Sequence, residues 1–93
     1  MTGKERAALR KKAHSLDPVI NIGKEGVTGA LCGSVSQALK ARELIKVCVL
    51  KNNPDDIRQT ALVLSERTRS ELIQVMGRKI TLYKYNPDKH KNK

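Results

Sequence analysis

Residues 20–28 read Ile-Asn-Ile-Gly-Lys-Glu-Gly-Val-Thr, and they decide the fold because a short apolar run stops at a Gly-x-x-Gly loop and a helical pattern follows directly. Gly23 and Gly26 let the main chain turn tightly and approach a ligand closely, since neither carries a Cβ atom. The first turn of the following helix offers unpaired N–H groups at the positive end of its dipole. We expect a phosphate or a sugar-phosphate backbone there. On the loop alone, an ordinary turn remains the alternative.

The length and charge of the chain limit what it can do. Its 93 residues suit one domain with one modest core. The 19 Lys and Arg residues against 9 Asp and Glu give a net charge of +10, which attracts polyanions. Nucleic acid is the first candidate partner and a membrane surface the second. No stretch approaches the roughly 20 apolar residues of a membrane span, and the N-terminus lacks a signal-peptide core, so we expect a cytoplasmic protein.

Hydrophobic periodicity and breaker residues predict three helices and four strands. The first two predicted helices run from Gly3 to Leu16 and from Thr28 to Ala41. The third runs to Thr68 and starts at residues 52–56, where an Asn cap is followed by Pro54 at the first helical position. The predicted strands are 19–22, 44–50, 72–76 and 79–83, the last two joined at Gly77-Arg78. We therefore predict an α/β fold of order α-β-α-β-α-β-β with a four-stranded mixed sheet.

Alternation within the strands predicts which side chains enter the core. Ile45, Val47 and Val49 share one face of the second strand, while Leu44, Lys46 and Cys48 share the other. In the two C-terminal strands we expect Ile73, Val75, Ile80 and Leu82 to point the same way. We divide the chain into one domain over residues 1–85 and a basic tail over 86–93, which either stays flexible or touches nucleic acid.

Basic side chains outside the loop form the second candidate surface. In the first helix, Lys4, Arg10, Lys11 and Lys12 belong to a stripe of five cations with only Glu5 to offset it. A cation on a helix is commonly just solvated, and that interpretation stays open for Lys40 and Arg42, which we include as candidates. With no Phe or Trp and two Tyr residues, backbone or shape recognition is favoured over base stacking.

Catalytic and metal-binding motifs do not emerge from the sequence. A P-loop would need Gly-x-x-x-x-Gly-Lys-Ser/Thr, whereas here Lys24 lies between the glycines. Cys32 and Cys48 fall at apolar positions, where buried free thiols are expected rather than a disulfide. His14 and His90 are far apart, so neither a metal site nor a Cys–His pair can be proposed. We expect no enzyme activity and no cofactor.

Three ordered motifs carry a family resemblance: residues 22–28 (IGKEGVT), 43–47 (ELIKV) and 74–83 (QVMGRKITLY). Together they resemble the CRM domain family, named for chloroplast RNA splicing and ribosome maturation, and above all its stand-alone bacterial YhbY-type members. The resemblance covers nearly the whole chain except the tail. It implies an RNA-binding domain with a fold like the C-terminal domain of bacterial translation initiation factor three. It also implies association with precursors of the large ribosomal subunit.

The resemblance also implies where RNA is contacted. The RNA-contacting loop of the family falls on Gly23, Lys24, Glu25 and Gly26, and its basic helix surface falls on residues 10–12. We add Thr28, which can cap the helix after the loop, to the candidate RNA-binding residues. Ribosomal RNA of the large-subunit precursor is the expected partner. The alternative is an adaptor that docks on a ribosomal protein through the second sheet face around Cys48, Met76 and Tyr83.

Overall fold

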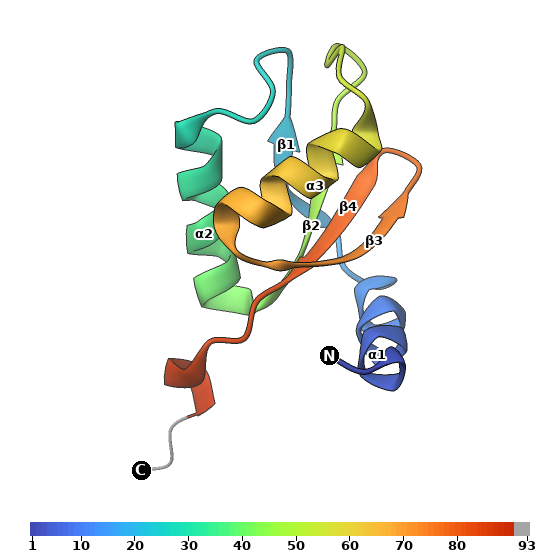
Figure 1. Cartoon of the computed structure of the whole chain (residues 1–93), viewed down its shortest axis with the longest axis vertical. Coiled ribbons are helices and arrows are strands. Elements are labelled where there is room, and N and C mark those ends of the chain that lie inside the picture. Colours follow the sequence, from blue (N-terminus) through green and yellow to red (C-terminus); the bar gives the residue numbers. More distant parts are fainter. Residues whose placement is uncertain (91–93) are drawn as a thin grey trace.

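A computed structural model describes residues 1–90, which form three α-helices, four β-strands and a short 3-10 helix (Figure 1). In chain order the elements are α1 (Gly3–Ala13), β1 (Pro18–Ile22), α2 (Gly29–Arg42), β2 (Leu44–Val49), α3 (Ile57–Thr68), β3 (Glu71–Met76), β4 (Lys79–Tyr83) and η1 (Pro87–His90). The predicted order α-β-α-β-α-β-β is confirmed for the seven elements before η1.

The four strands of the described residues form one mixed sheet with the order β1-β2-β4-β3. β1 pairs with β2 in parallel, and β4 pairs antiparallel with both β2 and β3. The predicted mixed sheet is therefore confirmed. α2 connects neighbouring parallel strands, whereas α3 crosses over β4 to reach β3. Because β1 and β2 are parallel, the loop after β1 and the loop after β2 leave the same end of the sheet, at the top of Figure 1.

One face of the sheet carries the main core and is covered by α2 and α3. The buried side chains there come from α2, α3 and three strands: Ile22, Val35, Leu39, Ile45, Val47, Val49, Ala61, Leu64, Ile80 and Leu82. The predicted alternation in β2 is confirmed, because Ile45, Val47 and Val49 enter this core while Leu44 belongs to the opposite face. Burying these aliphatic side chains supplies most of the driving force for folding.

The opposite face is covered by α1 at one end only. Ala13 of α1 packs with Leu44 and Ile73 in a second, smaller cluster. The expectation that Ile73 points the same way as Val75 is wrong. Pairing between β3 and β4 shifts register between Leu72 and Gln74, so a bulge turns Ile73 under α1 while Val75 packs against the main core.

Capping side chains set where two helices begin. α1 starts with a capping box, in which the Thr2 hydroxyl accepts from the N–H of Glu5 and the Glu5 carboxylate accepts from the N–H of Thr2. The predicted start of α3, with an Asn cap and Pro54 inside the helix, is wrong. The helix begins at Ile57, and its N-cap is Asp56, which accepts from the N–H of Gln59.

Residues 86–90, which we assign to a flexible tail from sequence, are hydrogen-bonded to the end of α2 in the structure. The N–H of Asn86 donates to Glu43 at 2.8 Å, and the ammonium group of Lys89 donates to the carbonyl of Ala41 at 2.8 Å. The tail residues 91–93 lie outside the described residues. None of the helices in residues 1–90 is both long and apolar enough to cross a membrane.

Candidate nucleic-acid interface

The Gly-x-x-Gly loop is a tight turn whose conformation depends on Gly26. Its φ is +73°, and its N–H donates to the carbonyl of Gly23 at 3.1 Å. A side chain at Gly26 would be strained by this backbone conformation, and its Cβ atom would crowd Asp55 Oδ2 at 3.1 Å. Gly23 differs, because its φ is not in the left-handed region and a Cβ atom there would approach nothing closer than 3.9 Å.

Two side chains from outside the loop hold its carbonyl groups. Asn53, which is only 6% exposed, donates from Nδ2 to the carbonyl of Gly23 at 2.8 Å, and its Oδ1 accepts from the N–H of Asp55 at 2.8 Å. Arg67 of α3 donates from Nη1 to the carbonyl of Val27 at 2.9 Å. Both side chains therefore bind carbonyl groups of the loop and not its N–H groups. Neither residue is among the predicted site residues, although Asn53 lies in the segment read as a helix start.

Several backbone N–H groups of the loop and of the α2 start are left for a ligand. Within residues 1–90, the N–H groups of Lys24, Glu25, Gly29 and Ala30 have no hydrogen-bond partner. Thr28 caps α2 as predicted, since its hydroxyl accepts from the N–H of Leu31 at 3.1 Å. Lys24, Glu25, Thr28 and Ala30 line a shallow concavity of about 380 Å³ that reaches along α2 to Ser34. Unpaired donors at the positive end of a helix suit an anion.

The charges around this concavity are mixed. Lys24 and Glu25 are both exposed and both line it. Asp55 adds a second carboxylate close to Gly26. The side chains at the loop therefore provide no clear excess of positive charge, and what distinguishes the loop is its set of backbone donors.

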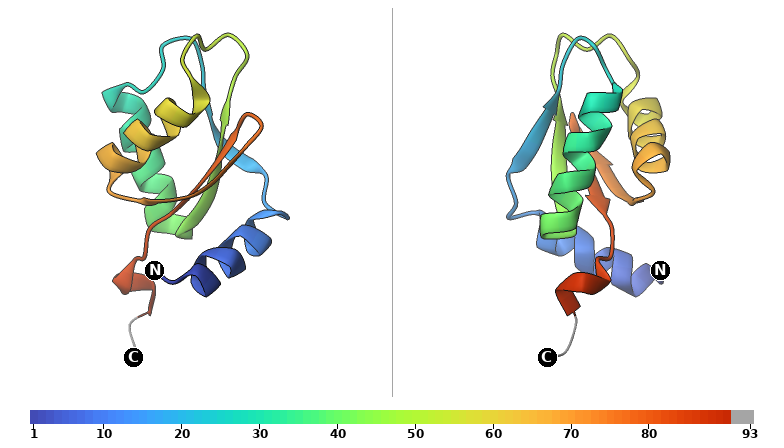
Figure 2. Two further views of the ribbon diagram at one scale, coloured as in Figure 1. Left: turned by 45° about the vertical axis from the view of Figure 1, so that its right-hand side comes forward. Right: turned by 90° about the vertical axis from the view of Figure 1, so that its left-hand side faces the viewer.

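The predicted cations of α1 lie at the other end of the molecule. Figure 1 shows the loop after β1 at the top and α1 at the bottom, and both views in Figure 2 agree. Lys4, Lys11 and Lys12 are exposed, and Arg10 is half-buried. Arg6, the fifth cation of the predicted stripe, donates instead to the carbonyl of Leu72 and lies 3.5 Å from the Glu71 carboxylate. It holds α1 on β3.

Lys40 and Arg42 are likewise separated from the loop. They occupy the last turn of α2, about 17 Å (Lys40) and about 20 Å (Arg42) along the helix axis from Gly29 at a rise of about 1.5 Å per residue. The structure thus brings residues 23–26 together with Thr28 and leaves the other six candidate residues at the far end of the domain.

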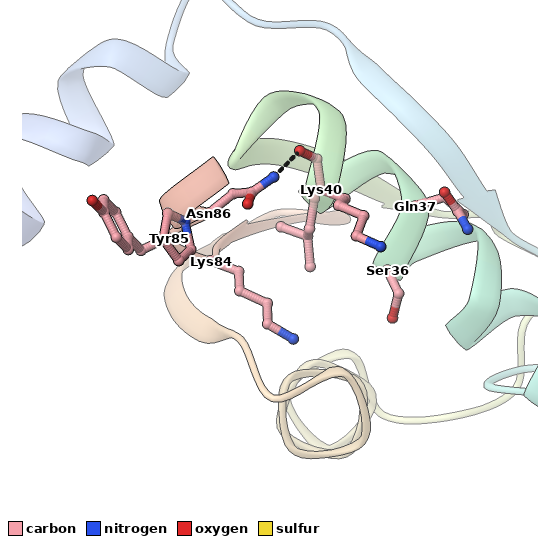
Figure 3. A pocket seen from close by; sticks show the side chains of 8 residues that line it. Ser36, Gln37, Lys40, Lys84, Tyr85 and Asn86 are labelled. Atoms are coloured by element: carbon pink, nitrogen blue, oxygen red, sulfur yellow. Dashed lines mark hydrogen bonds between the residues drawn. The ribbon is translucent and has the colours of Figure 1, made fainter. Parts of the chain in front are cut away.

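Lys40 lines a different cavity, which lies between α2 and the segment after β4 (Figure 3). Its volume is about 350 Å³, and Lys84 and Tyr85 lie on its other side. Asn86 closes one end by donating from Nδ2 to the carbonyl of Lys40 at 2.7 Å, the dashed line in Figure 3. The cavity thus lies between α2 and the segment after β4, which are joined by hydrogen bonds.

Two ionisable groups near this end have displaced pKa values. The pKa of Glu43 is lowered, first by the hydrogen bond from the N–H of Asn86 and also by His90, whose Nε2 lies 2.9 Å from Glu43 Oε2. Burial raises the pKa of Tyr83, which packs against the α1 cluster. Tyr85 stacks on His90 with ring centroids 4.8 Å apart. Neither tyrosine lies at the loop.

Cys32 and Cys48 are free thiols and half-buried. Within residues 1–90, no group of three or more His, Cys, Asp or Glu side chains is placed to hold a metal ion.

The fold and the loop define an α/β domain in which a strand leads through a Gly-x-x-Gly turn to a helix N-terminus. The family model of the CRS1/YhbY (CRM) domain matches residues 1–84, and the chain belongs to this family. It is 45% identical over 84 residues to "Probable RNA-binding protein YqeI" of Bacillus subtilis, covering 90% of this chain and 88% of the relative. It is 30% identical over 92 residues to "Probable RNA-binding protein PA4753" of Pseudomonas aeruginosa, covering 99% of this chain and 88% of the relative.

The fold also recurs in a solved structure. The solution structure of the hypothetical protein SAV1595 from Staphylococcus aureus matches with a TM-score of 0.79 and 46% sequence identity, covering 92% of this chain and 90% of that chain.

Proposed function

We propose that this chain is a non-catalytic RNA-binding protein that binds ribosomal RNA of the large-subunit precursor in the cytoplasm and serves assembly of that subunit. Relatives with 45% and 30% identity carry the name RNA-binding protein. The ribosomal setting follows from the family resemblance. The net charge of +10 supplies long-range attraction for such a ligand.

One observation carries the proposal for the loop. Three residues whose N–H groups have no partner in residues 1–90, Lys24, Glu25 and Ala30, line a shallow concavity, and Asn53 and Arg67 hold the loop there. RNA phosphates accept hydrogen bonds from such groups, and contacts to phosphate position an RNA without specifying its sequence. In this scheme Lys24 adds a charge beside the phosphate, and the cations of α1 contact a separate part of the RNA at the other end of the domain.

The adaptor alternative loses part of its surface. Tyr83 packs against the α1 cluster and is partly buried, although Met76 stays 56% exposed. No other observation favours a protein partner.

The loop assignment is tested by reversing one charge. Lys24→Asp keeps both glycines and places a carboxylate in the concavity, whereas Arg58→Asp makes the same change at an exposed position of α3. With a transcript of large-subunit precursor RNA, we expect Lys24→Asp to weaken binding by about 2 kcal/mol, roughly 30-fold, from the loss of a charge-assisted contact. Arg58→Asp reports the effect of the same charge change at a residue that does not line the concavity. Equal losses in two folded variants would reduce the loop to an ordinary turn.

A further inference from the structure

The open face of the sheet carries a groove that none of the predicted RNA-binding residues lines. α1 covers only one end of this face, as the views in Figure 2 show. Because Val47 and Val49 point into the main core, Lys46 and Cys48 point to the open face. Thr81 of β4 lies opposite both Lys46 and Gln74, so three polar side chains form a row across the strands.

The groove lies between the end of α1 and the β3–β4 hairpin. Its volume is about 230 Å³, and it is lined by Ala13, His14, Lys46, Gln74, Met76, Gly77, Lys79 and Thr81. The lining contains two lysines and no carboxylate. Arg10 lies one helical turn before His14 on the same flank of α1, so a third cation stands beside the groove.

Three polar side chains of the groove, Lys46, Lys79 and Thr81, are not used by the protein itself. Within residues 1–90, the ammonium groups of Lys46 and Lys79 make no hydrogen bond or ion pair. Thr81 is 2% exposed and its hydroxyl has no partner there, yet none of the enclosed side-chain N or O atoms of the described residues lacks one. The hydroxyl of Thr81 is therefore accessible from the groove.

We propose that this groove binds one nucleotide of a single-stranded RNA segment, a proposal that rests on the RNA-binding function above. Its volume is below the roughly 300–1,000 Å³ of usual small-molecule sites, which suits one nucleotide of a longer strand. Lys46 and Lys79 hold the phosphate, and Gln74 and Thr81 offer polar contacts to the base or the 2′-hydroxyl. Single strands can splay a base out to be contacted in this way, whereas the bases of A-form duplexes are stacked and paired.

The base needs an apolar contact, and Met76 provides it. Its side chain is 56% exposed at the edge of the groove, with its sulfur 3.9 Å from the Gln74 amide nitrogen. A flexible thioether adapts to different bases and takes the place of the aromatic rings that many sheet-binding RNA proteins use. We therefore expect weak preference among bases.

The test compares two double variants that each remove two positive charges. The first variant, Lys46→Gln with Lys79→Gln, changes the groove. The second, Arg58→Gln with Arg69→Asn, changes α3 and its C-cap on the opposite face of the sheet. Asn is chosen at position 69 because it tolerates the left-handed backbone conformation found there. The probe is a single-stranded eight-nucleotide oligouridylate. We expect the groove variant to bind about tenfold more weakly, with the log–log salt slope reduced by about 1.4. The α3 variant should lose threefold or less.

Backbone ¹⁵N chemical shifts of the parent protein provide a measurement that no variant can confound. Addition of the oligouridylate should move the amide signals of Gly77, Lys79 and Thr81. If these signals stay in place, or if the two double variants lose equal affinity, the groove is not an RNA site. A groove variant that binds RNA normally but loses a ribosomal protein would replace the RNA proposal with the adaptor.

The outcomes separate this proposal from the function on which it rests. If the Lys24→Asp loop variant loses binding to precursor ribosomal RNA while the groove signals stay in place, the loop function stands and the groove proposal falls. If Lys24→Asp has no specific effect but the groove responds, the groove stands without the loop. If the parent binds neither RNA at low salt, both fall.

Discussion

Asn53→Ala tests whether the loop is held in place from outside. The side chain makes two hydrogen bonds of 2.8 Å, to the carbonyl of Gly23 and from the N–H of Asp55, and it is 6% exposed. At about 1 kcal/mol for each bond, plus the cost of leaving partly buried partners without one, we expect a loss of about 2–3 kcal/mol in the free energy of unfolding. For a domain of this size, the melting temperature should fall by about 10–20 °C.

The neighbouring asparagine is the matched control. Asn52 is exposed, and its side chain makes no hydrogen bond within residues 1–90. Asn52→Ala should therefore stay within about 0.5 kcal/mol of the parent. Thermal and urea unfolding followed by circular dichroism measure both variants. If the two melting temperatures agree within about 2 °C, Asn53 does not hold the loop.

The same pair of variants links loop geometry to binding. At a temperature where both are folded, Asn53→Ala should weaken binding of precursor ribosomal RNA, because the carbonyl of Gly23 is released and the N–H groups of the turn lose their fixed direction. Asn52→Ala should bind as the parent does. Normal binding by a destabilised Asn53→Ala would show that RNA does not depend on the braced loop.

Four further outcomes are expected. Affinity for structured RNA should fall with salt on a log–log slope of about −3 to −5 for four to six phosphate contacts, and a slope near zero would contradict the electrostatic attraction. Replacing residues 10–12 together with Ala should weaken binding of many RNAs alike, which competition between unrelated transcripts would measure. The hydrogen bond from the N–H of Asn86 lowers the pKa of Glu43, so the ionised carboxylate stabilises the protein above the ordinary pKa near 4.5. This stabilisation is lost as the pH falls through the lowered pKa. Between pH 6 and pH 3, the melting temperature of the parent should therefore drop more than that of Glu43→Gln. Gly26→Ala should cost about 1–3 kcal/mol in unfolding free energy because of its φ of +73°, whereas Gly23→Ala should be nearly neutral, and equal melting temperatures would contradict this distinction.

Element order was predictable because each helix and strand has its own local signal. Alternation in β2 and the Gly77-Arg78 turn identify strands without reference to the rest of the chain; Gly77 has a φ of +59° as such a turn requires. The bulge that turns Ile73 under α1 was not predictable, because it depends on pairing with β4 across the sheet. The predicted helix start at Pro54 was wrong for a similar reason, because the Asn53 side chain donates to the carbonyl of Gly23, thirty residues away, and does not cap the helix.

The candidate site was predictable only where it is contiguous in sequence. Residues 23–26 and Thr28 come together because a strand, a turn and a helix follow one another within nine residues. Nothing local indicates that α1 lies at the far end from this loop, since its position depends on Ala13 packing with Leu44 and Ile73. The groove residues Lys46 and Lys79 meet only through strand pairing, so their sequence separation conceals them.

Counting charges overstates the basic surface available to RNA. Arg6, Arg67, Arg78 and Lys84 donate to backbone carbonyls of Leu72, Val27, Val49 and Thr68 and so contribute to folding. Removing one of these four cations would change stability as well as charge, and weaker RNA binding by such a variant would say little about contact with RNA. The cations that report on binding are those without an internal partner in residues 1–90, such as Lys24 at the loop and Lys46 and Lys79 in the groove. A mutational map of this surface should therefore begin with them.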